Sequence, residues 1–115
     1  MKKVVIVDYL RSPFSRSRPQ EPEKDKFNPL RMDHVGAMLI RKIVERVGVN
    51  PSEINEVVAA SALGVWEQWT YGGRSLVMLS KLPVEVPATF VDRQCGSSMS
   101  AVHLGAMEIM TGNSD

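Results

Sequence analysis

A long helical pattern near the C-terminus, with almost no charge on it, limits most strongly how this chain can fold. From about residue 96 to residue 110 the only charged side chain is Glu108. A helix without a charged face is normally buried on all sides, and one small sheet built from 115 residues cannot surround it. Its apolar stripe comprises Met99, Val102, Ala106, Ile109 and Met110. We therefore expect a cover from a second sheet, a second half of the molecule or a partner chain.

Strand and helix patterns alternate along the chain. Three contiguous aliphatic runs predict strands buried on both faces, and a helical pattern follows each of them. This β-α-β-α-β-α order predicts an α/β fold with a parallel sheet and right-handed crossovers. No strand pattern follows the last helix, so we expect an incomplete sheet, with residues 1–115 forming the N-terminal part of a longer polypeptide. The expected strands are 2–8, 56–63 and 86–92, and the expected helices are 32–48, 73–82 and 96–110.

Composition argues against several classes of function. The formal net charge is +1, with 23% charged and 6% aromatic residues, so we expect neither a basic nucleic-acid surface nor a base-stacking platform. No apolar run reaches the length of a membrane span. Asp8 and Arg11 interrupt the N-terminal aliphatic run, which argues against a signal peptide. The single cysteine cannot form an internal disulfide, and no Cys/His cluster has metal-ligand spacing, so we expect no metal and a reducing cytoplasmic setting.

Cys95, the only cysteine, lies where the third strand pattern ends and the uncharged helix pattern begins. The first N–H groups of a helix have no internal partners and carry a partial positive charge, which favours a thiolate. The same groups can hold the negative oxygen that develops when a thiolate attacks a carbonyl. The small residues Gly96, Ser97 and Ser98 leave room for an acyl group. Position alone leaves two interpretations open, a catalytic nucleophile and a buried structural cysteine.

Three segments resemble the thiolase family, which includes 3-ketoacyl-CoA thiolase and acetyl-CoA acetyltransferase. The most specific is "VPATFVDRQCGSSMSAVHLGAMEIMTG" (residues 86–112), which is similar to the family's nucleophile segment. "VVIVDYLRSPFSRS" is similar to its opening strand and turn, and "YGGRSLVMLSKLPVEVPA" to the segment ahead of the nucleophile. The resemblance covers the whole chain in order. The departures from the family pattern are Ser12, Tyr71, Gly73, Asp92 and Ser98, whereas Arg74 is kept.

The resemblance implies a fold and a reaction. The fold is a layered α/β/α/β/α sandwich, of which this chain would supply an incomplete half, with its last helix in the central layer. Cys95 would be the nucleophile that carries the acyl thioester, and its backbone N–H would contribute to an oxyanion site. Acyl-CoA would be the substrate and coenzyme A a substrate or product, with no permanently bound cofactor. The family also implies a homodimer or homotetramer.

The resemblance also places the activating histidine, the second cysteine and most of the CoA-binding loop beyond these 115 residues. We therefore expect that this chain alone does not turn over, because catalytic groups of this kind act as a unit. Two other interpretations stay open. One is a related condensing enzyme of the ketoacyl synthase type, and the other is a non-catalytic subunit or scaffold that folds against a partner.

The two histidines are weak candidates for the base that activates Cys95. His103 follows Cys95 by eight residues, which corresponds to about 12 Å along a helix axis and is too far for a hydrogen bond. His34 begins the first predicted helix, and no pattern places it near the thiol. We expect both to have structural or surface positions.

Two loops carry further candidates. The first, residues 11–31, contains four prolines and should have no long regular element. Its arginines could bind a phosphate, but acidic neighbours favour a solvated loop. The aromatics of the second loop, residues 65–73, could line an acyl pocket or a subunit interface. The candidates are Arg11, Arg16 and Arg18 in the first loop, and Trp66, Trp69 and Tyr71 in the second.

Overall fold

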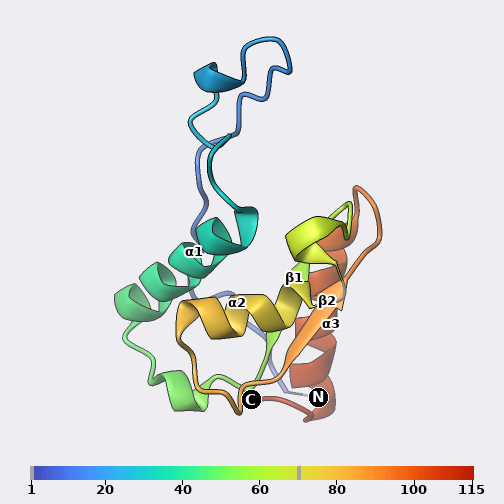
Figure 1. Cartoon of the computed structure of the whole chain (residues 1–115). Helices are drawn as coiled ribbons and strands as arrows, with labels where there is room; N and C mark the ends of the chain where they lie inside the picture. Colours follow the sequence, from blue (N-terminus) through green and yellow to red (C-terminus); the bar gives the residue numbers. More distant parts are fainter. Residues whose placement is uncertain (1, 70) are drawn as a thin grey trace.

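The computed structural model describes residues 2–69 and 71–115. The described chain has two strands and three α-helices, joined by loops that contain single turns of 3-10 helix (Figure 1). The strands are β1 (Val57–Ala60) and β2 (Ala88–Val91), and the helices are α1 (Met32–Val47), α2 (Gly72–Ser80) and α3 (Ser97–Thr111). The 3-10 turns are η1 (Pro22–Lys24), η2 (Pro51–Glu53) and η3 (Trp66–Gln68).

The two strands form a parallel pair with a helix against each face. Val57 pairs with Ala88 at one end of the ladder, and Ala60 pairs with Val91 at the other. Helix α2 packs on one face, with α1 along its outer side, while α3 packs on the opposite face (Figure 1). The crossover through α2 between parallel strands confirms the predicted α/β class.

The core lies between α1, α2 and their face of the sheet. Val77 on α2 is completely buried, and Leu82 and Val86 in the loop after α2 are nearly so. Partly buried side chains pack around them, namely Ile40, Val44, Ile54, Val57 and Ala88. Helix α1 presents its apolar stripe to this core and ends at Gly48, whose φ of 73° is the left-handed conformation that glycine adopts without strain. The amphipathic prediction for residues 32–48 is therefore confirmed.

Helix α2 approaches the sheet closely because its first turn contains glycine. A Cβ atom built on Gly73 would lie 2.8 Å from the backbone oxygen of Thr89 in β2, which is closer than any side chain can come. Arg74, the next residue, donates hydrogen bonds to the carbonyl oxygens of Val86 (2.7 Å) and Val84 (2.6 Å). Arg74 thus fastens α2 to the segment that leads into β2.

The predicted first strand is wrong. Residues 2–8 run beside β1 and α3 but form no strand, and their backbone makes no hydrogen bond to β1 in the described part of the chain. Ile6 is 81% exposed, so the aliphatic run is not buried on either face as its pattern indicated. The segment is held by its polar ends, through Lys2 with Asp115 and Asp8 with Arg46. A contiguous aliphatic run is typical of a strand that is buried on both faces. A strand forms, however, only where a neighbouring strand pairs with its backbone and other elements bury its faces.

The proline-rich loop forms an arm that projects from the body (Figure 1). Its only regular element among the described residues is η1. Asp25 braces the arm internally, because its carboxylate accepts hydrogen bonds from the Ser15 hydroxyl and the Phe27 N–H (2.9 Å for the latter). These bonds hold the pKa of Asp25 below its ordinary value. Among the described helices, none is long and apolar enough to cross a membrane.

Candidate active site

Cys95 lies in a tight turn between β2 and α3, and its side chain is exposed. Helix α3 begins two residues after it at Ser97 and ends at Thr111, with Gly112 as its C-cap, in agreement with the predicted order of strand, cysteine and helix. The turn is closed by two backbone hydrogen bonds, from Gly96 N–H to the Arg93 carbonyl (3.0 Å) and from Ser97 N–H to the Gln94 carbonyl (3.1 Å). The described residues do not bury this cysteine.

The residue before the thiol has a strained backbone. Gln94 has a φ of 51°, in the left-handed region that costs a residue with a side chain about 1 kcal/mol or more. The carboxylate of Asp92 accepts hydrogen bonds from the Gln94 N–H (3.1 Å) and from its side-chain amide (3.4 Å). Backbone strain of this kind persists only where surrounding contacts stabilise it. The contacts around the turn therefore hold Gln94 and Cys95 in this conformation.

The backbone N–H of Cys95 has no hydrogen-bond acceptor among residues 2–69 and 71–115. A free N–H beside a thiol, at the positive end of a fifteen-residue helix, is a donor suited to a developing oxyanion. No side chain caps the start of α3 in the described part of the chain. An exposed thiol and a backbone N–H without an acceptor in the described residues thus belong to the same residue.

Ser97 is the residue that reading the sequence missed. Its side chain is buried, with Ser97 only 3% exposed, and its hydroxyl accepts a hydrogen bond from the Arg93 N–H at 2.7 Å. The same oxygen lies 2.9 Å from the carbonyl of Ser61, just after β1, and 2.7 Å from the carbonyl of Gln94. The sequence suggested only that Ser97 is small enough to leave room for an acyl group. The sole local signal for another role is a serine at the start of a helix, where its hydroxyl often bonds the nearby backbone.

Neither histidine meets the thiol. His34 on α1 and His103 on α3 are both exposed, and no hydrogen bond joins either side chain to Cys95 in the described residues. The exposure of His34 agrees with the expected surface position, and His103 is exposed in the described chain rather than packed. A base for Cys95 does not come from the described histidines.

The arginines of the arm lie in a solvated loop. Arg18 pairs with Glu21 at 3.3 Å, and Arg11 lies over the Phe14 ring, 5.2 Å from its centroid. Arg16 is exposed. Opposite charges within the arm offset the basic groups, so the arm presents no concentrated positive field.

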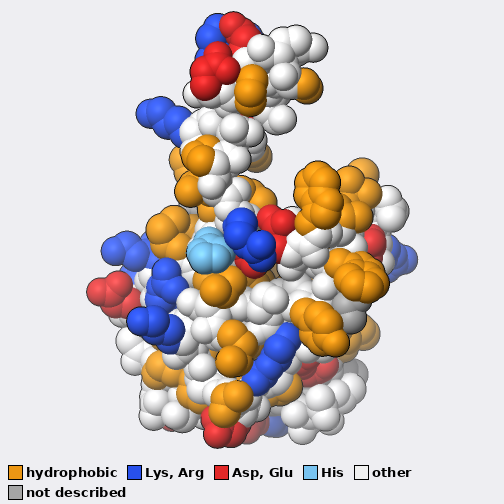
Figure 2. Space-filling view, in the orientation of Figure 1, with side chains coloured by type: hydrophobic (Ala, Val, Ile, Leu, Met, Phe, Trp, Pro, Cys, Tyr) orange, Lys and Arg blue, Asp and Glu red, His pale blue; other side chains and the backbone are white. Residues whose placement is uncertain are grey.

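The aromatic loop lies on the surface. Trp66 is 88% exposed, and Trp69 and Tyr71 are also exposed. Figure 2 shows hydrophobic side chains gathered on the surface over η3 and the start of α2. Their exposure leaves both the acyl-pocket and the interface interpretations of the loop as predictions.

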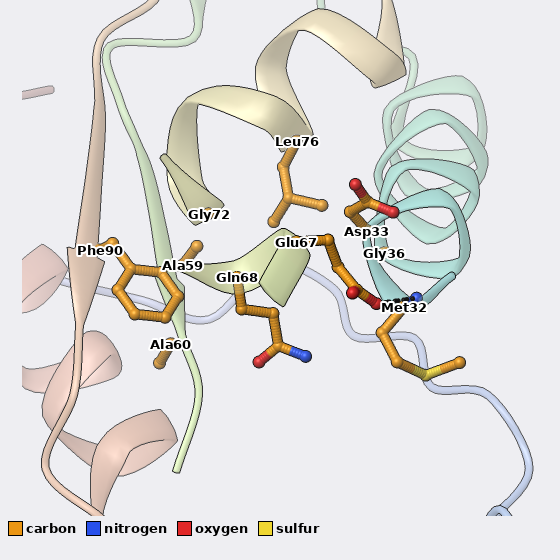
Figure 3. Close-up of a pocket in the computed structure, with 10 residues that line it drawn as sticks. All are labelled: Met32, Asp33, Gly36, Ala59, Ala60, Glu67, Gln68, Gly72, Leu76 and Phe90. Carbon is orange, nitrogen blue, oxygen red and sulfur yellow. Dashed lines mark hydrogen bonds between the residues drawn. The ribbon is translucent and has the colours of Figure 1, made fainter. Parts of the chain in front are cut away.

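A cavity of about 190 Å³ opens between α1, α2 and the sheet (Figure 3). The Phe90 ring and Leu76 form apolar walls, and the Glu67 carboxylate accepts a hydrogen bond from the Met32 N–H (3.2 Å). Asp33 also lines it, and the Arg31 guanidinium holds the pKa of this carboxyl below its usual range. Cys95 does not line this cavity, which lies on the α1 and α2 side of the sheet. No group of metal-binding side chains occurs among the described residues.

The chain matches known proteins over its whole length. The family model described as thiolase, N-terminal domain, matches residues 4–115. A 3-ketoacyl-CoA thiolase of Vibrio vulnificus (strain YJ016) is 40% identical over 116 residues, which cover 100% of this chain and 29% of the relative. A 3-ketoacyl-CoA thiolase of Pectobacterium carotovorum subsp. carotovorum (strain PC1) is 36% identical, with the same coverage of both chains. The chain thus spans less than a third of the length of these relatives. With its mixed α/β architecture and this match, the chain belongs to the thiolase family, within that family's N-terminal domain.

Proposed function

We propose that this chain is the nucleophile-bearing part of a thiolase-type acyltransferase, and that Cys95 accepts the acyl group. The observation that carries the proposal is the exposed thiol on a strained turn, at the start of α3, beside a backbone N–H that has no acceptor among the described residues. The relatives' name, 3-ketoacyl-CoA thiolase, supplies the substrate class, which is acyl-CoA or 3-ketoacyl-CoA.

The first chemical step forms an acyl thioester on the enzyme. The Cys95 sulfur attacks the carbonyl carbon of the substrate, and the carbonyl oxygen becomes an oxyanion that the Cys95 N–H can receive. Collapse of this intermediate expels the coenzyme A thiolate from an acyl-CoA, or the acetyl-CoA carbanion from a 3-ketoacyl-CoA, and either leaving group takes up a proton. The acyl group remains bonded to sulfur.

The second step removes the acyl group from Cys95. In the degradative direction the coenzyme A thiolate attacks the acyl thioester and releases a shortened acyl-CoA. In the biosynthetic direction the carbanion of acetyl-CoA attacks it, which forms a carbon–carbon bond. Coenzyme A is a substrate or product in both directions, and neither direction requires a permanently bound cofactor.

The proposal assigns the remaining machinery to the rest of a longer polypeptide. Neither described histidine contacts Cys95, so the base and the second, acid/base cysteine would come from residues beyond 115. We further propose the layered α/β/α/β/α sandwich for the complete protein, with residues 1–115 as an incomplete half. A homodimer or homotetramer, a role in fatty acid metabolism and a reducing cytoplasmic setting belong to the same proposal.

Replacing the nucleophile in the complete protein tests the proposal. Cys95→Ser should lower turnover by about 10³-fold or more, because an unactivated hydroxyl is a far weaker nucleophile than a thiolate. His103→Ala is a matched control, since His103 lies on the same helix and makes no hydrogen bond to Cys95 in the described residues, and it should keep turnover within about twofold. The measurement is steady-state thiolysis together with the initial burst of released coenzyme A from acetyl-CoA.

A non-catalytic subunit with the same fold is the second candidate. The observation in its favour is that no histidine among the described residues reaches Cys95. This candidate predicts no acyl-enzyme in the complete protein and an unchanged phenotype for Cys95→Ser. Turnover that survives Cys95→Ser would contradict the acyltransferase assignment of this residue.

A further inference from the structure

We propose that Ser97 is a positioning residue for Cys95, and that its buried hydroxyl holds the nucleophile turn in register with the sheet. The inference rests on the proposed acyltransfer at Cys95. It concerns how the thiol and its N–H are aimed, and not which residue attacks.

The Ser97 hydroxyl fastens both sides of the turn. Its oxygen accepts a hydrogen bond from the N–H of Arg93, which precedes Cys95 by two residues. Ser97 itself follows Cys95 by two residues, so this 2.7 Å bond closes the turn around the thiol. A hydroxyl has a single proton, which Ser97 can give to the carbonyl of Gln94 (2.7 Å) or to that of Ser61 (2.9 Å).

Ser61 connects the turn to both strands. It directly follows β1, and its N–H donates a hydrogen bond to the carbonyl of Val91, the last residue of β2 (3.2 Å). The Ser97 hydroxyl therefore reaches the point where the carboxyl ends of the two strands meet. The pairing of the two parallel strands fixes the position of this sheet edge, and the Ser97 hydroxyl ties the turn to it.

The turn needs such a brace because Gln94 is strained. Its φ of 51° would relax toward an unstrained conformation if the surrounding hydrogen bonds were lost. Asp92 supplies one exposed brace at the Gln94 N–H, whereas Ser97 supplies a buried one. Removing the Ser97 hydroxyl would leave the Arg93 N–H without its acceptor, and it would free Gln94 to move together with Cys95.

Ser52 provides the control serine. It lies in η2, outside the turn that holds Cys95, it is exposed, and its hydroxyl makes no hydrogen bond in the described part of the chain. The Ser97→Ala and Ser52→Ala substitutions therefore remove the same chemical group from two places. They differ in whether that group braces the turn.

The test compares Ser97→Ala, Ser97→Thr and Ser52→Ala in the complete enzyme. For Ser97→Ala we expect kcat to fall about tenfold to 10²-fold with KM within about twofold, since a misaimed nucleophile slows the chemical step more than binding. Threonine keeps the hydroxyl and should restore most of kcat, and Ser52→Ala should match the wild type. Thermal unfolding of each variant is measured in parallel, and the assays are run well below the lowest unfolding midpoint.

Three results would overturn the inference. The first is a Ser97→Ala enzyme with a lowered Tm but an unchanged kcat, which would make the hydroxyl structural only. The second is an equal loss in Ser52→Ala, and the third is a Ser97→Thr variant no better than alanine. If Ser97→Ala does not fold, Gln94→Gly is added, because glycine adopts φ near 51° without strain. The double variant should still show a lowered kcat relative to Gln94→Gly alone, and equal values would overturn the inference.

Alkylation of Cys95 separates this inference from the proposed function. Iodoacetamide reacts with the thiol whether or not the protein transfers acyl groups. A changed alkylation rate in Ser97→Ala, with Ser52→Ala unchanged, supports positioning even if the wild type forms no acyl-enzyme, a result that would refute only the proposed function. Equal alkylation rates in all variants, with an intact acyl-enzyme burst, would refute the positioning role.

Discussion

The two faces of the β1–β2 sheet are covered in different ways. On the α2 face, Val77 is fully buried, and α1 adds a second helical layer over it. On the α3 face there is one helix, and its only buried residue is Ser97. Val102 is 57% exposed, and the other large apolar side chains of the helix are exposed or half-buried. The same small sheet therefore has one face with a core and one face with an uncovered apolar helix.

The helix sequences account for this difference. Helix α1 has a charged side and an apolar side, so a single neighbour on its apolar side is enough to bury it. Helix α3 has a single charged residue, Glu108, and exposes side chains that water does not favour. The apolar side of the amphipathic helix α1 is buried by neighbours within this chain. Helix α3, which has no charged face, needs to be buried on more sides than the described residues can cover. We propose that the remainder of the polypeptide or a second copy supplies this cover.

The largest effect is expected on the α2 face. Val77→Asp places a carboxylate in a completely buried site without a partner, which should cost about 4 kcal/mol or more and leave the chain unfolded. Far-ultraviolet circular dichroism and chemical denaturation measure this. Val77→Ala, the milder control, should remain folded with a lowered unfolding midpoint. A stably folded Val77→Asp chain would show that the core does not lie around Val77 on the α2 face.

The next effect concerns the link from α2 to β2. Arg74→Ala removes two charge-assisted hydrogen bonds to the carbonyls of Val84 and Val86, and should lower the free energy of unfolding by about 2 kcal/mol. Arg74→Lys should have a free energy of unfolding between those of the alanine variant and the wild type, because an ammonium group lacks the planar guanidinium that bonds both carbonyls. Urea denaturation gives the values. An alanine variant as stable as the wild type would show that these bonds add nothing net.

A smaller, pH-dependent effect is expected on the α3 face. The Thr89 hydroxyl lowers the pKa of Glu56, but burial and the neighbouring Glu108 carboxylate outweigh it and raise this pKa above its ordinary value. A raised pKa in the folded state means that the stability from Glu56 is present below its ordinary value of 4.5 and is lost as the pH rises through the folded value. The pKa of Glu108 is lowered, chiefly by its hydrogen bond with Glu56, so its contribution has the opposite dependence and partly offsets the first.

Glu56→Gln removes the raised group while keeping a side chain that can hydrogen-bond. At pH 7 it should raise the free energy of unfolding by about 0.5 kcal/mol, and the gain should disappear near pH 4. Urea denaturation at the two pH values measures both numbers. A loss of stability at pH 7 would mean that the Thr89 and Glu108 contacts favour the ionised form instead.

The smallest effect on stability is expected for a charge on the exposed side of α3. In the 115-residue chain, Val102→Asp should change the free energy of unfolding by less than about 0.5 kcal/mol, because Val102 is already in water. It should however reduce self-association, which the exposed apolar side chains of α3 favour. Sedimentation of wild type and variant over a range of concentrations reports both states. A monodisperse wild-type monomer at high concentration would show that the exposed apolar side chains of α3 need no further cover.

The sequence predicted the elements whose patterns are local. The apolar spacing of residues 32–48 and the stop at Gly48 define α1 almost to the residue, and the order of strand, Cys95 and helix predicts the nucleophile turn. The strand predicted for residues 2–8 is wrong, because pairing depends on a neighbouring edge that a local pattern does not reveal. Ser97 was missed for the same reason, since its role depends on Ser61, which is distant in sequence.

The direct test of the central claim is to find where the acyl group is bonded. The complete protein is incubated with acetyl-CoA, quenched in acid and digested with trypsin, which cleaves after Arg93 and leaves Cys95 near the start of its peptide. The proposed function predicts an acetyl thioester on Cys95 that disappears when free coenzyme A is added before quenching. An unmodified Cys95 in a protein that turns over, or an acetyl group on another residue that coenzyme A removes, would contradict the claim.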